Sequence, residues 1–362
     1  MAVKRVWIIC LAGVFLAPGS APGKVSIDWV TVGDPKNVGE GSGESYGGQA
    51  PDRICGAVGY VYRIGKCEVA NVQYAEFLNA VDPDGTNPYG LYNTSMAGGW
   101  SDIGGIDYYS AAPSGQKYSV RAGRGNKPVN YVSWYDALRF ANWMTNGQGT
   151  GDTESGAYAI TGSAPNWTVS VPDASQRETW ANGSTPYVLL ASEDEWYKAA
   201  YYKGGDYNAG YWDYATQSDT LPDNNDPNQD SGNSANYNSE SIGNPNGWAV
   251  GPPDYTTDVG AYESSLSAYG TADQSGNLFE WNEADLYGDG SSYGVRGGSF
   301  YHPDYDLPAY QRSGLYFPAT YEGWDVGFRV ALVEVIPEPL TMLGVFAGIA
   351  GLGGYIRKRL AV

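Results

Sequence analysis

The segment VRGGSFYHPDYDLPAY, residues 295–310, brings together side chains that could carry out chemistry. A Gly-Gly turn precedes Ser299, a candidate nucleophile, and His302 is a candidate general acid or base because its charge changes near neutral pH. No recognisable motif gives Ser299 a histidine base, and a lone histidine beside Asp304 and Tyr305 can also be purely structural. The segment therefore predicts either an active site that uses these side chains or a loop that keeps only the shape of such a site.

The first element expected to position this loop lies at residues 60–81. The sequence alternates as one long strand through Val69 and then changes to a helical period. Asn71 is the expected N-cap, and Tyr74, Phe77 and Leu78 fall on one face of the helix. We therefore expect a strand that leads directly into an amphipathic helix.

Two further helices are indicated by capping-box patterns. Ser133 stands three residues before Asp136, and Ser192 stands three residues before Glu195, directly after a short apolar strand. The rest of the sequence is mostly polar and turn-forming, without a sustained apolar period or an internal repeat. Long irregular stretches of this kind are uncommon unless they are functional or held by something such as a metal ion.

No linker divides residues 24–336, so we expect one large domain with few helices, short strands and much coil. Residues 1–23 have the basic start, apolar run and small residues of a secretory signal peptide. A membrane anchor is the alternative, although the apolar run is shorter than the roughly 20 residues that a span needs.

The other end, residues 337–362, begins with Pro-Glu-Pro, continues with an apolar stretch at 340–356 and ends in a basic cluster. This order resembles the bacterial PEP-CTERM sorting tail, which implies removal by a dedicated sorting protease. The apolar stretch is long enough to be a marginal transmembrane helix. We expect an exported protein of a bacterial cell surface or extracellular matrix, in contact with the membrane only through this tail before processing.

The net charge of the chain limits the classes of partner that it is expected to bind. With 40 acidic and 21 basic residues the formal net charge is −19, and several of the basic residues lie in the two terminal segments. Nucleic acids and anionic membranes are poor partners for such a surface, whereas cations are good ones.

Two cysteines, Cys55 and Cys67, remain after the predicted signal peptide. Export permits a disulfide between them, but two cysteines far apart on one long strand cannot reach the required Cα separation. Both outcomes stay open.

Five ordered motifs between about residues 58 and 332 resemble the formylglycine-generating enzyme, or sulfatase-modifying factor, domain family. They are YRIGKCEVANVQYAEFLNAV, PVNYVSWYDALRFANWM, LLASEDEWYKAA, DQSGNLFEWNE and VRGGSF with VGFRVA, with insertions at 145–187 and 204–230. The resemblance implies an α+β fold similar to C-type lectins, with low regular secondary structure and long loops. This agrees with the pattern of short elements and long coil.

Catalytic members of that family use two cysteines after the Gly-Gly-Ser turn to bind copper and to oxidise a substrate cysteine to formylglycine. The corresponding positions here are His302 and Leu307, so copper is not expected, because soft Cu(I) needs thiolates. Another branch uses an iron site with three histidines, and this chain has one histidine in total. The known redox ligands of the family are therefore missing.

The resemblance also implies a calcium site. By this analogy the side chains of Asp273 and Glu280 and the backbone carbonyls of Gly276 and Leu278 would bind the ion, and such oxygen ligands suit calcium. The alternative is that these acids face solvent. Asn236 and Tyr237 match a second calcium site more loosely, with Asp254 as a candidate acidic partner.

We therefore expect a non-catalytic, calcium-stabilised binding domain with a glycan or peptide ligand, because the high Tyr and Trp content suits stacking on sugars or peptides. An oxidoreductase of altered chemistry, using His302 with Tyr301, Asp304 and Tyr305, is the first alternative. A structural matrix component without a specific ligand is the second.

Overall fold

The structure, a computed structural model, describes residues 24–42, 53–312 and 317–336. The predicted signal peptide and the predicted sorting tail, with its apolar stretch at 340–356, lie outside the described residues. Among the residues that are described, no helix is long and apolar enough to cross a membrane.

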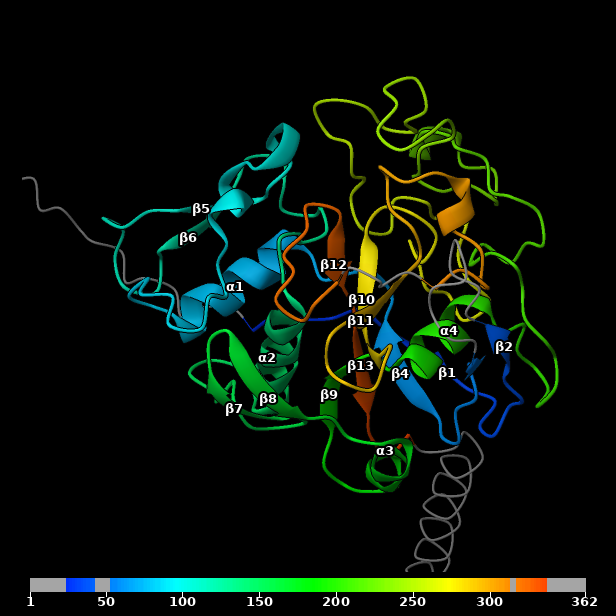
Figure 1. The fold of residues 1–362 in the computed structure, drawn as a ribbon, viewed down its shortest axis with the longest axis horizontal. Helices are drawn as coiled ribbons and strands as arrows, with labels where there is room; N and C mark the ends of the chain where they lie inside the picture. Colours follow the sequence, from blue (N-terminus) through cyan, green and yellow to red (C-terminus); the bar gives the residue numbers. More distant parts are fainter. Residues whose placement is uncertain (1–23, 43–52, 313–316, 337–362) are drawn as a thin grey trace, which may run out of the picture.

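Small sheets joined by long coil form the centre of the molecule (Figure 1). The four-stranded sheet has the order β1-β4-β13-β9, with β1 at Trp29–Val32, β4 at Tyr62–Gly65, β13 at Val330–Val333 and β9 at Tyr187–Leu190. The three-stranded sheet has the order β11-β10-β12, with β11 at Tyr293–Arg296, β10 at Phe279–Asp285 and β12 at Val326–Phe328. Strand β10 is antiparallel to β11 and parallel to β12.

Two-stranded ribbons lie around these sheets. They are β2 (Glu40–Ser42) with β3 (Arg53–Cys55), β5 (Ile106–Tyr108) with β6 (Tyr118–Val120), and β7 (Ala159–Ser163) with β8 (Asn166–Ser170). The helices are α1 (Asn71–Val81), α2 (Trp134–Thr145), α3 (Ala174–Ala181) and α4 (Glu193–Tyr201), with short 3-10 turns η1 (Thr94–Ala97), η2 (Trp100–Asp102), η3 (Pro227–Gln229) and η4 (Asp304–Asp306). The predicted α+β fold with short elements and much coil is confirmed.

The helix starts follow the capping patterns, with one correction. Ser133 and Ser192 cap α2 and α4 through the predicted capping boxes. Helix α1 is capped by Ala70 rather than by Asn71. The amide of Asn71 instead donates to the carbonyls of Arg124 and Lys127, at 3.0 Å each, and so ties α1 to the following loop.

The strand before α1 is shorter than predicted. Strand β4 ends at Gly65, where Arg329 donates to the carbonyls of Gly65 and Lys66. Cys55 lies in β3 and Cys67 lies beyond β4, and both are free thiols. The 145–187 insertion, which has no sustained apolar period, forms β7, β8 and α3.

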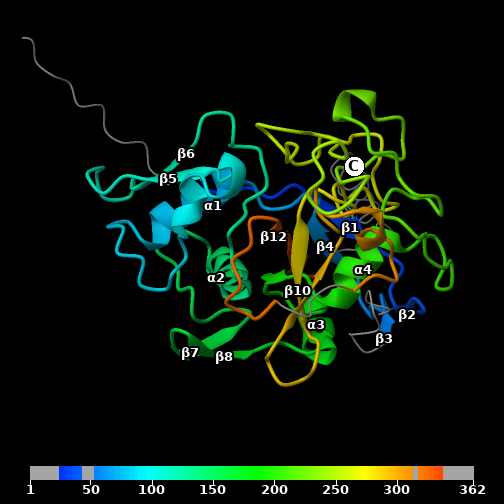
Figure 2. The same cartoon turned by 45° about the horizontal axis from the view of Figure 1, so that its top comes forward.

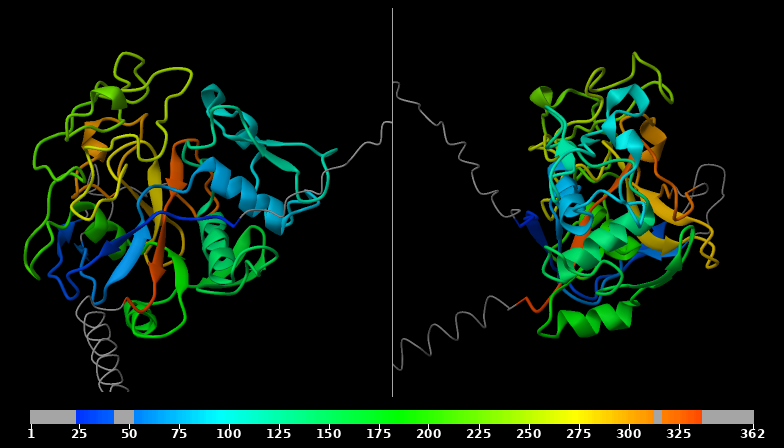
Figure 3. Two further views of the ribbon diagram at one scale, coloured as in Figure 1. Left: turned by 180° about the vertical axis from the view of Figure 1, so that it is seen from behind. Right: turned by 90° about the vertical axis from the view of Figure 1, so that its left-hand side faces the viewer.

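An aromatic core joins α1 and α2 to the three-stranded sheet. The ring centre of Phe140 lies 5.4 Å from that of Phe77, 5.4 Å from that of Phe328 and 5.7 Å from that of Trp143. Figure 2 and the reverse view in Figure 3 show α1 and α2 on one side of β10 and β12, with the coil of residues 202–275 on the other. The two faces of this sheet therefore carry different sites.

Candidate functional site

The Gly-Gly turn closes the core and does not present Ser299. Gly297 and Gly298 have φ angles of +95° and +74°, a region that favours glycine. A Cβ at Gly298 would meet the Leu307 side chain at 2.7 Å. Arg296 points inward and lies 2.8 Å from Glu193, and Ser299 is completely buried. The candidate nucleophile is therefore out of reach of a substrate in this structure.

His302 is held between two carboxylates. Its Nδ1 lies 2.8 Å from Asp306 and its Nε2 lies 3.3 Å from Asp325. Burial alone would lower the pKa of His302, but the hydrogen bonds to these carboxylates raise it to about 9. At neutral pH the ring is therefore an imidazolium that donates from both nitrogens, so it cannot act as a general base. The partners are Asp306 and Asp325 rather than the predicted neighbour Asp304.

Leu307, where the sequence resemblance implied a cysteine in catalytic relatives, is a core residue. Its side chain is completely buried in a cluster with Ala235 and Tyr237. The Leu307 side chain packs its own loop against residues 235–237 and is not accessible to a ligand.

The segment predicted to bind calcium is tightly turned. Asp273, Gly276 and Asn277 all have positive φ angles, of 61°, 84° and 60°. A Cβ at Gly276 would lie 2.3 Å from the carbonyl oxygen of Asn236, so only glycine fits. Asn277 N donates to the same carbonyl at 2.8 Å, so the structure brings the two predicted calcium segments side by side.

Glu280 pairs with an arginine. Its two carboxylate oxygens accept from Nη2 and Nε of Arg329, both at 2.5 Å, and one of them also accepts from Trp196 Nε1 at 2.8 Å. Both charged side chains are completely buried. Glu280 therefore does not fit the role of a free calcium ligand.

Asp273 fits that role better, and it has an unpredicted neighbour. Its Oδ2 accepts from Gly260 N at 2.5 Å, whereas its buried Oδ1 has no partner. Glu68 accepts from Asn277 with one oxygen, and its buried Oε2 has no partner. Burial raises the pKa of Asp273 to about 6, and burial followed by the charge of Asp273 raises that of Glu68.

The donor set is therefore partly suited to calcium. Two buried carboxylate oxygens without hydrogen-bond partners are suitable ligands for a cation, although the guanidinium of Arg329 already interacts with both carboxyl groups. No group of three or more His, Cys, Asp or Glu side chains among the described residues is arranged to hold a metal ion. Backbone carbonyls, such as those of Gly276 and Leu278, would have to complete the shell.

The second predicted calcium segment is arranged less favourably. Asn236 is buried, with its amide nitrogen donating to the carbonyl of Tyr255 at 2.9 Å and its Oδ1 unpartnered. The Tyr237 hydroxyl donates to the carbonyl of Pro222 at 2.9 Å. Asp254, the candidate acidic partner, lies 3.9 Å from the ammonium of Lys127, so a positive charge is already present there.

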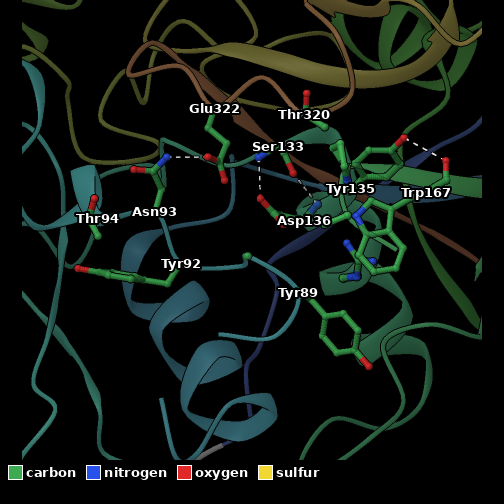
Figure 4. Close-up of a pocket in the computed structure, with 14 residues that line it drawn as sticks. Tyr89, Tyr92, Asn93, Thr94, Ser133, Tyr135, Asp136, Trp167, Thr320 and Glu322 are labelled. Carbon is green, nitrogen blue, oxygen red and sulfur yellow. Dashed lines mark hydrogen bonds between the residues drawn. The ribbon is translucent and has the colours of Figure 1, made fainter. Parts of the chain in front are cut away.

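On the side of α1 and α2 the structure has a cavity of about 370 Å³ at the start of α2. Aromatic side chains and polar groups line it (Figure 4). The sequence did not predict it, because its walls come from four separate segments: Tyr89 and Tyr92, Tyr135, Trp167, and Glu322. The capping box of α2 was the one signal that marked part of this site in advance.

Comparison with known proteins gives a family and a fold. The model of the Sulfatase-modifying factor enzyme 1-like domain matches residues 43–333. No curated protein matches the chain with significance.

Solved structures resemble the chain at low identity. "Treponema denticola variable protein 1" is 19% identical over 88% of this chain and 100% of that chain, with a TM-score of 0.49. The structure titled "Crystal Structure of CarF" is 21% identical over 86% and 99%, with a TM-score of 0.49. PvdO from Pseudomonas aeruginosa is 16% identical over 84% and 94%, with a TM-score of 0.45.

Proposed function

Because the chain belongs to the sulfatase-modifying factor enzyme 1-like domain family, we propose that it has kept the family scaffold as a non-catalytic binding domain. The observation that carries this proposal is the state of the two positions where the resemblance implies copper-binding cysteines. His302 is an imidazolium fixed by two carboxylates, and Leu307 is part of the core. Neither side chain can supply a thiolate for copper or a base for proton transfer.

The first prediction is that the purified protein does not convert a sulfatase-type cysteine peptide to formylglycine. With copper and oxygen supplied, mass spectrometry of the peptide should show no more aldehyde than the no-enzyme control. The free thiols Cys55 and Cys67 are buried or partly buried, and burial raises the pKa of Cys55 to about 11 and that of Cys67 to about 12, which disfavours thiolates. Conversion above the control would refute the non-catalytic assignment.

Calcium stabilisation is part of the same proposal, with Asp273 and Glu68 proposed as the carboxylate ligands. Asp273 and Glu68 offer unpartnered carboxylate oxygens, whereas Glu280 is committed to Arg329. An ion that binds only the folded state adds roughly 2.7 kcal/mol at a hundredfold excess over its Kd.

The second prediction concerns chelation. Chelator should lower the Tm of the wild type by several degrees, and Asp273→Asn and Glu68→Gln should each abolish most of that response. Asp84→Asn, at an exposed aspartate, is the matched control and should respond like the wild type. Equal wild-type Tm values in calcium and in chelator, with no bound metal by elemental analysis, would remove calcium from the proposal.

Export and sorting complete the proposal, supported by the order of features in residues 1–23 and 337–362. Intact-mass analysis of the protein from its native host should show that residues 340–362 have been removed. Recovery of the mature protein with the complete tail would contradict sorting by cleavage.

A general test of binding is an array of glycans and peptides probed with the purified protein. Specific binding to either class supports a binding domain. Binding to neither class would favour the structural matrix component instead.

A further inference from the structure

The cavity at the start of α2 is separate from the His302 loop and from the Asp273 segment. It is built from the loop before η1, the first turn of α2, the β7–β8 ribbon and the segment at 320–322. Its volume of about 370 Å³ lies within the range of about 300–1,000 Å³ that is typical of small-molecule sites. Figure 4 shows Tyr89, Tyr135 and Trp167 gathered at the right of the view, and Asn93, Thr94 and Glu322 at the left with the ring of Tyr92.

The aromatic rings are fixed by Arg139, which lines the same cavity. The guanidinium carbon of Arg139 lies 5.0 Å from the ring centre of Tyr89 and 4.4 Å from that of Trp167. Glu154 binds the same guanidinium through two hydrogen bonds of 2.6 and 3.0 Å, which balances its charge. The Tyr135 hydroxyl donates to the carbonyl of Trp167 at 3.3 Å and fixes the ribbon against α2. Rings fixed in this way lose little entropy when a ligand stacks on them.

The polar side can both donate and accept hydrogen bonds. Glu322 accepts from the Asn93 amide with Oε2 at 2.6 Å (Figure 4), which orients its carboxyl group. Burial, and then the charge of Asp136, raise the pKa of Glu322 to about 7, so near neutral pH this group is present in both protonation states. Asp136 itself is nearly completely buried and accepts from Ser133 N as part of the helix cap. Hydroxyls of Thr94 and Thr320 also line the cavity.

These features disfavour charged ligands of either sign. Arg139 also lines the cavity, but Glu154 already balances its charge, so an anion would meet the uncompensated acids Glu322 and Asp136 in a chain whose net charge is −19. An organic cation would need the ring faces, but Arg139 already lies against Tyr89 and Trp167, so a second positive charge there would be close to the first. A neutral ligand with an apolar face and several hydroxyls meets neither obstacle.

We propose that this cavity binds a neutral saccharide, with a sugar ring stacked on the exposed surfaces of Tyr89 and Trp167 and its hydroxyls bonded to Glu322. The inference rests on the proposed function, because it names the ligand class and the site of that binding domain. Sugar hydroxyls donate and accept at once, which matches the mixed character of the polar side.

The test uses the purified protein on an array of neutral mono-, di- and trisaccharides, followed by calorimetric titration of the saccharide that binds best. Tetramethylammonium and citrate serve as the cationic and anionic probes. Trp167→Ala and Glu322→Ala should weaken saccharide binding by roughly tenfold or more, since each removes one of the main contacts. Glu322→Gln keeps the hydrogen-bonding shape without the charge and should bind within a few-fold of the wild type.

Trp180→Ala is the matched control, because Trp180 lies in the same insertion but stacks on Tyr187 outside the cavity. It should bind like the wild type, and circular dichroism should show that all variants are folded. Saccharide binding that is unchanged in Trp167→Ala and Glu322→Ala would overturn the site while leaving a binding domain intact. Binding of tetramethylammonium or citrate without any saccharide would overturn the ligand class, and an array without any glycan or peptide signal would refute the proposed function itself.

Discussion

Replacing Glu280 by alanine is expected to lower the free energy of unfolding by about 3–5 kcal/mol, because it leaves the guanidinium of Arg329 buried without its counter-charge. Arg329 is completely buried and would keep only backbone carbonyls, those of Gly65, Lys66 and Ala272, as acceptors. The Trp196 indole would lose its acceptor as well. Urea denaturation of the wild type and the variant measures the difference.

The same experiment in chelator separates the ion pair from calcium. The Glu280–Arg329 pair needs no metal, so the difference between wild type and Glu280→Ala should persist when calcium is removed. Alanine at the exposed Glu263 is the control and should change stability by no more than about 0.5 kcal/mol. A difference that disappears in chelator would mean that Glu280 acts mainly as a calcium ligand.

The second large effect is expected at Glu193, which joins α4 to the Gly-Gly turn. Arg53, Arg296 and Arg312 lie 3.0, 2.8 and 2.7 Å from its carboxylate. Burial alone would raise the pKa of Glu193, but the three arginines together hold it at about 2. Glu193→Gln removes the charge that they share and should cost about 3–5 kcal/mol of stability at neutral pH.

The acid response of this cluster has a definite sign. The pKa of Glu193 is lower in the folded state than the ordinary value of 4.5, so its contribution is fully present above about pH 4.5 and is lost as pH falls toward 2. A shift of this size corresponds to about 3 kcal/mol. The stability of the wild type minus that of Glu193→Gln should therefore shrink over this window, as measured by urea denaturation at each pH. A difference that stays constant from pH 6 to pH 2 would contradict the three-arginine account.

Elements defined by neighbouring residues could be predicted from the sequence. The caps at Ser133 and Ser192 depend on side chains three residues away, and the apolar face of α1 depends on spacings within two turns. Interactions of this range are determined locally, because the backbone between the partners can adopt few other arrangements. The ordered motifs also predicted the family and its α+β fold, which the comparison with the family model confirms.

Elements determined by distant partners could not be predicted. Strand β4 stops at Gly65, where the carbonyls of Gly65 and Lys66 accept from Arg329, a residue far along the chain. Asn71 does not cap α1 because its amide reaches the loop at Arg124 and Lys127. Nothing in the local sequence of residues 60–71 carries this information.

The charge states of the candidate site residues also depend on partners that are distant in the sequence. From the sequence, the family resemblance predicted that His302 and Leu307 stand where catalytic members have cysteines and that Asp273 belongs to a calcium-binding segment. Only the tertiary structure showed that His302 pairs with Asp325 and that Glu280 forms a buried ion pair with Arg329. The physical reason is that the charge state and accessibility of a buried side chain depend on every group packed around it, and packing joins residues that sequence spacing keeps far apart.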